Sequence, residues 1–246
     1  MSEVPAQVWV VVLAGVAGLP VVTAVGLARC AHESGRRGWL PAAVFVVGWT
    51  GVVALCWALA SAGAFRQSTT EAEPWFGLFA GTVLAVALAG TAAPPVAAAL
   101  RAPGSLAWLT WSQALRVVGV AFLLMFALDR LPAAFALPAG LGDLAIGLTA
   151  PVVARRLARG DRRGAVAFHV LGTLDLVVAL TIGALAGAAA ADLMVLPLVL
   201  IPGTLVPLAL TLHVAALLRL RGHPATTAAG DATAGLDVAG AQSGTT

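Results

Sequence analysis

The chain has 246 residues, of which 60% are hydrophobic and only 10% are charged, and its formal net charge is +3. A soluble domain carries about 25% charged residues, so a chain with so few charges could not cover a water-exposed surface, and a lipid bilayer is the solvent that fits it. All the basic residues are arginines, most of them in short loops, and no aromatic-basic platform accompanies them, so we expect no nucleic-acid partner.

Seven apolar runs follow one another along the chain. Each is near the length of about 20 residues that a helix needs to cross about 30 Å of hydrocarbon. We therefore predict an all-α bundle of seven transmembrane helices within residues 1–221. Residues 222–246 are small, polar and low in complexity, and we expect them to form a disordered cytoplasmic tail. The expected spans are residues 7–28, 39–61, 75–97, 107–128, 133–154, 165–187 and 193–218.

Prolines mark two of these spans. The stretch "AAPPVAAALRAPGSLAW" after the third run holds three prolines, so we expect the third helix to stop or bend near Ala93. The seventh run, "LPLVLIPGTLVPLALTLH", carries Pro197, Pro202 and Pro207. Such breaks free backbone carbonyls and line substrate sites in some transporters, although prolines are also common in membrane helices generally.

The arginines between the runs predict an orientation. The loops on one side carry eleven of them, whereas the loops on the other side carry only Arg66 and Arg130. Because cytoplasmic loops are enriched in basic residues, we expect the N-terminus outside the cell and the C-terminus in the cytoplasm. The eleven are Arg29, Arg36, Arg37, Arg101, Arg155, Arg156, Arg159, Arg162, Arg163, Arg219 and Arg221.

Asp143 lies inside the fifth run, "AGLGDLAIGLTAPVVARR". On a helix it shares a face with small residues, and a leucine-rich face is turned roughly 120° away. Leucines suit lipid and small residues suit a close helix neighbour, so we expect Asp143 to point into the bundle. The small face holds Gly140, Gly147, Ala150 and Ala154, and the other face holds Leu137, Leu141, Leu144, Leu148 and Val152.

Asp175 and Arg116 lie at a similar depth. Like Asp143, each lies about 15–18 Å from an end of its span and therefore near the midplane, so the three groups could meet. An isolated charge there costs roughly 2.5–3.5 kcal/mol, which pairing of Arg116 with Asp143 or Asp175 would reduce. One arginine cannot neutralise two carboxylates, so the second aspartate is expected to hold a proton. The alternative is that Arg116 snorkels to the cytoplasmic surface and that the aspartates are merely protonated hydrogen-bond donors between helices.

His169 and His213 form a second candidate pair. Each lies about 9 Å inside the cytoplasmic end of its span, on the sixth and seventh helices, so both could ligate one haem or one metal ion. With only two such histidines inside the spans and no supporting ligand cluster, we favour the interpretation that they are interfacial and bonded to loops or lipid headgroups.

The segments "DLAIGLTAPVVA", "FHVLGTLDLVVAL" and "LPLVLIPGTLVPLALTLHVAALLRL" resemble a family of small uncharacterised bacterial integral membrane proteins. That family has an aspartate followed by "GLTAP", and a seventh span that ends with "VPL", leucines and a histidine. The residues that fall on this pattern are Asp143, 147–151, Pro202, Pro207 and His213, whereas Asp175 stands where the family has an apolar residue. The resemblance covers roughly residues 143–220, and it implies the topology but no activity.

Several chemistries lack their sequence signatures. Without a lysine, the chain cannot hold retinal as a Schiff base. It also has no phosphate-binding glycine loop, no zinc-protease motif and no serine nucleophile elbow. We therefore lean against an enzyme and expect no cofactor.

The leading hypothesis is a small-solute or proton-coupled carrier in the plasma membrane, with Asp143 as the coupling or binding group and Asp175 and Arg116 as its neighbours. One alternative is a non-catalytic scaffold or accessory subunit. The other is a haem- or metal-binding protein that uses His169 and His213. The expected partners are the lipid bilayer and either another membrane protein or a second copy of the chain.

Overall fold

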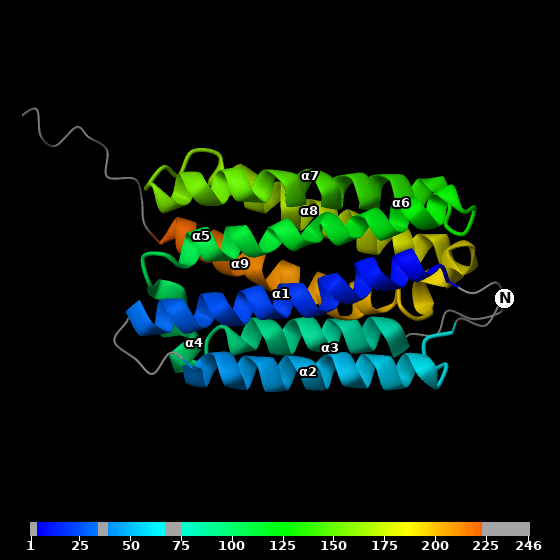
Figure 1. Ribbon diagram of the computed structural model, residues 1–246, viewed down its shortest axis with the longest axis horizontal. Helices are drawn as coiled ribbons and strands as arrows, with labels where there is room; N and C mark the ends of the chain where they lie inside the picture. Colours follow the sequence, from blue (N-terminus) through cyan, green and yellow to red (C-terminus); the bar gives the residue numbers. More distant parts are fainter. Residues whose placement is uncertain (1–3, 34–38, 67–74, 223–246) are drawn as a thin grey trace, which may run out of the picture.

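The chain folds into a bundle of roughly parallel and antiparallel helices. The computed structural model describes residues 4–33, 39–66 and 75–222, and within these ranges every regular element is helical (Figure 1). The elements in chain order are α1 (Ala6–Glu33), α2 (Trp39–Ser61), α3 (Trp75–Gly90), α4 (Pro94–Arg101), α5 (Ser105–Ser112), η1 (Gln113–Gly119), α6 (Val120–Ala127), α7 (Ala133–Ala158), α8 (Ala165–Ala186), η2 (Gly187–Met194), η3 (Ile201–Leu205) and α9 (Val206–Arg221).

Six helices in the described ranges are long and apolar enough to cross a membrane. A seventh is obtained if α3 and α4, which meet at an angle of 71°, are counted as one broken span. The break follows Gly90 and precedes Pro94, in agreement with the bend expected near Ala93. The expected tail at residues 223–246 lies outside the described residues.

Two expected spans are not uniform α-helices. The fourth, at Ser105–Ala127, changes to a 3₁₀-helix over η1 and then returns to α-helix in α6. The seventh begins only at the π-helical turn η3, not at residue 193. Pro197 lies in the non-helical stretch before η3, and Pro202 and Pro207 lack the amide hydrogens that an α-helical ladder needs, which accounts for the altered winding of η3. Within η3 the ladder widens, and the Val206 amide donates to the carbonyl of Ile201, five residues back.

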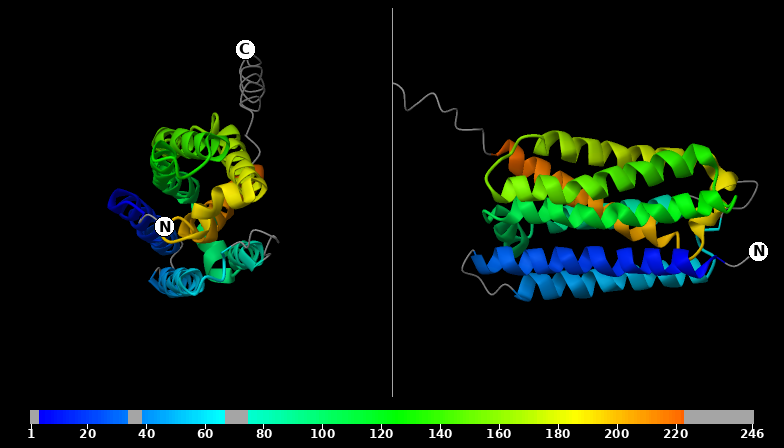
Figure 2. Two further views of the ribbon diagram at one scale, coloured as in Figure 1. Left: turned by 90° about the vertical axis from the view of Figure 1, so that its right-hand side faces the viewer. Right: turned by 45° about the horizontal axis from the view of Figure 1, so that its top comes forward.

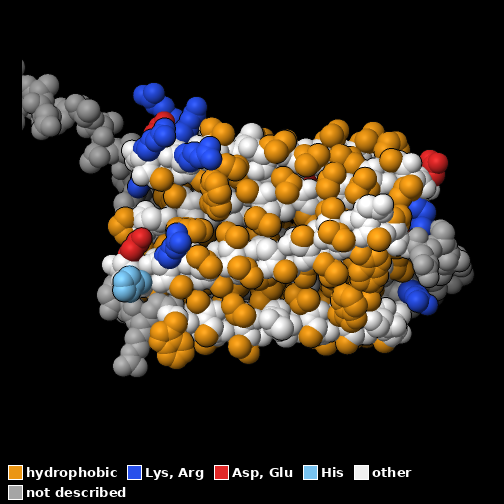
Figure 3. Space-filling view, viewed as in Figure 1, with side chains coloured by type: hydrophobic (Ala, Val, Ile, Leu, Met, Phe, Trp, Pro, Cys, Tyr) orange, Lys and Arg blue, Asp and Glu red, His pale blue; other side chains and the backbone are white. Residues whose placement is uncertain are grey.

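The surface matches the interior of a bilayer along most of its length. Figure 3 shows hydrophobic side chains covering the middle of the bundle, whereas charged side chains gather at the two ends, more densely at one. The last turns of α7 and α9 place Arg155, Arg156, Arg219 and Arg221 at the denser end. We call it the arginine-rich end.

Burial differs sharply between the helices. In the apolar window of the span formed by η3 and α9, 78% of the residues are buried, whereas in α2 only 11% are. Figures 1 and 2 show why: α7 and α8 lie on one side of the bundle, α2 and α3 lie on the other, and α9 runs between them. Every part of α9 therefore has protein neighbours, and these surround the candidate site.

Candidate functional site

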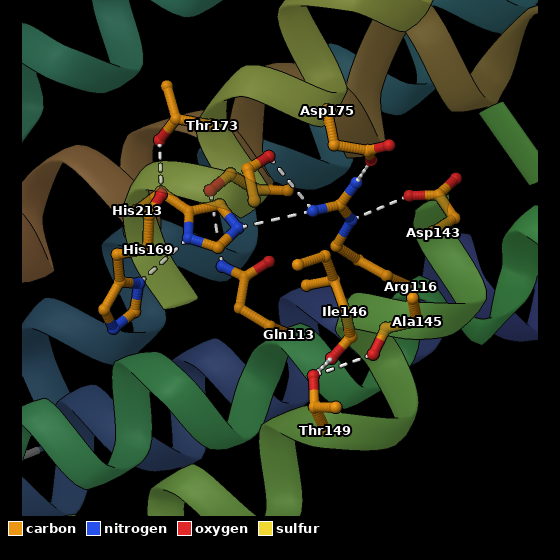
Figure 4. A network of polar contacts seen from close by, with 12 residues as sticks. Gln113, Arg116, Asp143, Ala145, Ile146, Thr149, His169, Thr173, Asp175 and His213 are labelled. Carbon is orange, nitrogen blue, oxygen red and sulfur yellow. Dashed lines mark hydrogen bonds and ion pairs between the residues drawn. The ribbon is translucent and has the colours of Figure 1, made fainter. Parts of the chain in front are cut away.

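Arg116 is the centre of a buried polar cluster. It lies in η1, at the middle of the broken helix Ser105–Ala127, and its relative exposure is 3%. Its Nε donates to Oδ1 of Asp143 on α7 over 2.7 Å, and its Nη2 pairs with Oδ2 of Asp175 on α8 (Figure 4). Its Nη1 donates to the carbonyl of Gly172 at 3.2 Å. The expectation that the three ionisable groups meet is confirmed, and the alternative that Arg116 snorkels to the surface is wrong.

The 3₁₀ winding of η1 is what aims these side chains. A 3₁₀-helix has three residues per turn, so residues three apart stand in line. Gln113, Arg116 and Gly119 therefore form one row, and all three are buried. Gln113 donates from Nε2 to the carbonyl of Ala209 on α9, whereas Arg116 and Gly119 meet α7 and α8. A regular α-helix would have turned the three residues apart.

The carboxylate of Asp143 faces inward as the sequence predicted. Its small-residue companions on α7 are buried, and Leu137, Leu141, Leu148 and Val152 are exposed on the opposite face. Asp143 itself is buried, with its side chain 10% exposed, and Asp175 is slightly more open at 19%.

Glycines on neighbouring helices make room for the polar side chains. A Cβ at Gly119 would overlap the side chain of Asp143, and one at Gly142 would overlap the carboxylate of Asp175. A Cβ at Gly172 would likewise overlap the imidazole of His213. Each polar group thus rests against a residue without a side chain, so that η1, α7, α8 and α9 approach one another closely.

His169 and His213 are not interfacial, and the favoured interpretation of this pair was wrong. Both are 0% exposed. Their Nδ1 atoms lie 2.9 Å apart, Nε2 of His169 lies 3.1 Å from Oγ1 of Thr110, and Nε2 of His213 lies 3.5 Å from Nη1 of Arg116. Depth along each helix predicted that the two rings could meet, but it could not show that α5 and η1 cover them.

The partners at the two ends of this chain of contacts determine where the hydrogens lie. Arg116 can only donate, so Nε2 of His213 accepts, and a neutral His213 carries its hydrogen on Nδ1. That hydrogen is donated to Nδ1 of His169, whose own hydrogen is then on Nε2 and is donated to Thr110. Thr110 in turn donates to the carbonyl of Leu106 at 2.8 Å. All the hydrogens therefore point from Arg116 toward Leu106.

The charges of the cluster do not balance without a bound proton. One guanidinium faces two carboxylates, so the group carries one negative charge when both aspartates are ionised, and it is neutral when one of them holds a proton. A cavity of about 20 Å³, lined by Arg116, Asp143 and apolar side chains of α1, α8, η3 and α9, lies beside the pair. That is enough room for about one water molecule, which would find polar partners there.

The histidine pair does not fit a haem or a metal ion. A haem iron between the rings would hold the two nitrogens about 4 Å apart, and a tetrahedral zinc ion would hold them about 3.3 Å apart. The Nδ1 atoms are 2.9 Å apart, which is hydrogen-bonding distance. In the parts of the chain that the structure describes, no three His, Cys, Asp or Glu side chains come close enough to hold a metal ion.

Comparison with known proteins places the chain in a family. A model described as a domain of unknown function, DUF8737, matches residues 73–221, which is more than half of the chain. The chain belongs to the DUF8737 family. The matched DUF8737 region begins just before α3 and ends with α9, so it contains the whole polar cluster, whereas α1 and α2 precede it. No curated protein and no solved structure matches the chain.

Sequence reasoning missed Thr110 and the role of Gly142. Thr110 lies in α5, one turn before Gln113, and the polar residues Thr110, Ser112 and Gln113 in this otherwise apolar run could have indicated a buried polar region. Gly142 directly precedes Asp143, and only the position of α8 shows that Asp175 rests on it.

Proposed function

We propose that the chain is a plasma-membrane carrier that couples the movement of a small solute to protons, and that the coupling site consists of Arg116, Asp143 and Asp175. One observation carries the proposal: two carboxylates share a single guanidinium in the middle of the bundle. Intramembrane ionisable residues are rare and expensive, and they commonly mark ion or proton pathways.

The cluster has two charge states that differ by one proton. Moving a net charge through a medium of low dielectric constant is costly, so the neutral, proton-loaded state favours rearrangement of the helices and the ionised state opposes it. This difference ties a change of shape to proton binding, which is the central requirement of a proton-coupled carrier.

The helices beside the cluster contain two segments that depart from α-helical winding. Arg116 itself lies in the 3₁₀ segment η1, and the π-helical turn η3 supplies Ile201 and Leu205 to the small cavity next to it. Segments of both kinds inside longer helices often mark hinges and functional sites. Broken helices near the midplane also surround the substrate sites of many transporters.

The histidine pair provides a second place for a proton. If His213 gained a proton on Nε2, its positive charge would face the guanidinium of Arg116 at about the present 3.5 Å. Repulsion between the two cations would push Arg116 toward the aspartates and strengthen their ionised state. Protonation at the histidines would thus expel a proton from the carboxylates. The histidines lie on the arginine-rich side of Arg116, which we propose faces the cytoplasm, with the N-terminus outside.

The test is proton flux in proteoliposomes that contain a pH-sensitive dye. A panel of solute classes is added one at a time, and a carrier should give solute-dependent acidification or alkalinisation for one class. The Asp143→Asn variant should fold but lose this flux, because an amide cannot exchange the proton.

Asp192→Asn is the matched control. Asp192 also pairs with an arginine, Arg130, at 2.6 Å, but it lies in η2 outside the spanning helices. This variant should keep wild-type flux. Normal flux in Asp143→Asn would overturn the proposal and shift the weight to a scaffold or accessory subunit.

A further inference from the structure

A large apolar cavity lies on the opposite side of α5 and α9 from the polar cluster. Its volume is about 650 Å³, within the range of about 300–1,000 Å³ that is typical of ligand sites. Side chains of α1, α2, α3, α4, α5 and α9 line it. On α2 the lining runs from Leu40 to Leu55, a distance of about 22 Å along the helix axis. The cavity is thus elongated parallel to the helices and reaches from the arginine-rich end past the middle of the bundle.

Apart from the indole Nε1 of Trp49, which has no hydrogen-bond partner, the described wall of the cavity offers little to a polar ligand. Six serine and threonine side chains belong to it, and the hydroxyl of each donates to a backbone carbonyl. The rest of the wall is aliphatic, aromatic, glycine or cysteine. Such a surface suits a hydrocarbon chain. The six residues are Thr23, Thr82, Thr91, Ser105, Ser112 and Thr211.

Arginines border the cavity at the arginine-rich end. The Arg29 guanidinium lies 5.0 Å above the ring of Trp108, which lines the cavity. Arg101 directly follows the lining residue Leu100. Arg219 donates to the carbonyl of Ala102 and lies close enough to Arg101 to feel its charge.

The positive charge at this end is only partly offset. Arg219 and Glu33 both lie near Cys30, another residue of the cavity wall. Among the described residues, Glu33 brings a carboxylate to this end beside Gly104, whereas Arg29, Arg101 and Arg219 bring three positive charges. An anionic headgroup at this end would reduce their mutual repulsion.

From this arrangement we infer that the cavity binds an anionic membrane phospholipid, with an acyl chain between α2, α3 and α9 and with its phosphate at Arg29, Arg101 and Arg219. The lipid stands parallel to the helices, as lipids do in the surrounding leaflet. Juxtamembrane arginines attract anionic lipid headgroups. The weak packing of α2, which is buried over only 11% of its apolar window, leaves room for lipid to exchange. This inference does not depend on proton coupling.

Native mass spectrometry tests the inference. The full-length protein is mixed in mild detergent with equal amounts of phosphatidylglycerol and phosphatidylcholine, and the lipid that it retains is counted. We expect one retained phosphatidylglycerol, favoured about tenfold over phosphatidylcholine. Equal retention of the two lipids, or a dimer with no lipid bound, would overturn the inference.

Two glycines on α2 supply a matched pair of variants. A Cβ at Gly48 or at Gly51 would meet no other atom, but only Gly48 lines the cavity. Gly48→Phe should fill the cavity and lower retention about tenfold, whereas Gly51→Phe should retain lipid as the wild type does. Retention that is the same in both variants contradicts the inference. Should Gly48→Phe not fold, Gly90→Phe makes the same test from the opposite wall, because a Cβ at Gly90 also meets nothing.

The headgroup contact has its own pair of variants. Replacing Arg29 and Arg101 together by glutamine should abolish the preference for phosphatidylglycerol while an acyl chain is still bound. Arg66→Gln, at the other end of the bundle, should leave the preference intact. A preference that survives the double replacement would show that these arginines do not hold the headgroup.

Discussion

The two sides of α9 are built on different principles. Toward α7 and α8 the interior is polar and dense: charged groups are paired, glycines let the helices approach, and the cavity beside Arg116 has room for about one water. Toward α2 and α3 the interior is apolar and loose, with a cavity of about 650 Å³. Paired charges need fixed distances, whereas a hydrocarbon chain needs only volume. The helix α9 therefore separates a polar region in which the distances between side chains are fixed from an apolar region in which a bound hydrocarbon chain can be exchanged.

Because both aspartates pair with Arg116, we expect the losses of stability caused by replacing Asp143 and Asp175 to be strongly non-additive. Asp143→Asn or Asp175→Asn alone should cost at most about 1 kcal/mol, because Arg116 keeps one carboxylate and the asparagine resembles a protonated acid. The double variant leaves Arg116 buried and unpaired and should cost about 3–5 kcal/mol.

Thermal unfolding in detergent, followed for the wild type, both single variants and the double variant, gives the coupling between the two aspartates. Additive effects would mean that the two carboxylates act independently of Arg116. The polar side of α9 would then not be a region of coupled charges, and the contrast with the apolar side would fail.

The dense packing predicts a large penalty for single methyl groups. Gly172→Ala would drive a Cβ into the imidazole of His213 and should destabilise the protein by about 1–3 kcal/mol. Gly81→Ala on α3 is the control, since its Cβ would meet nothing, and alanine is the better helix former. Equal unfolding temperatures in the two variants would show that the polar side is no tighter than the apolar side.

A smaller effect is expected at the end of the histidine contacts. Thr110→Val removes the acceptor for the His169 Nε2–H and should cost about 1–2 kcal/mol, because that donor is left buried without a partner. Thr181→Val on the exposed face of α8 removes only a bond to the carbonyl of Val177, so it should change stability by less than about 0.5 kcal/mol. The difference in unfolding temperature between the two variants measures this contact.

The smallest effect is expected for the ion pair outside the spans. Asp192→Asn breaks the contact with Arg130, but both side chains are partly exposed to solvent, so the loss should be about 0–1 kcal/mol. Added salt should weaken this pair and leave the buried cluster unchanged. If the unfolding temperature of Asp192→Asn fell as far as that of the Asp143 and Asp175 double variant, the peripheral ion pair would stabilise the protein as much as the buried cluster does, contrary to this expectation.

The sequence correctly predicted the features that depend on the residues of a single helix. The face of Asp143 and the break near Ala93 depend on helical periodicity and on proline alone, and both were predicted correctly. Depth along each helix also predicted that Arg116 could meet Asp143 and Asp175.

The sequence was insufficient wherever neighbouring helices decide. His169 and His213 look interfacial along their own helices, and only the covering by α5 and η1 buries them. The change to 3₁₀ winding at Gln113–Gly119 contains no proline to announce it, and it is favoured by the contacts that its row of side chains makes with α7, α8 and α9.

In the run of contacts from Arg116 to Leu106, every hydrogen has a fixed direction. The run begins at a group that never accepts and ends at a carbonyl that never donates, so only one assignment of hydrogens satisfies every contact. In many hydrogen-bonded chains the direction of all the donors can reverse when each member rotates in turn. Here the reversed arrangement would leave contacts unsatisfied, so the chain has only one stable arrangement of its hydrogens. An extra proton on either imidazole consequently places a second donor where this arrangement needs an acceptor. The contact at that ring is lost, and the surrounding helices must relax until the proton leaves and the hydrogen bonds form again.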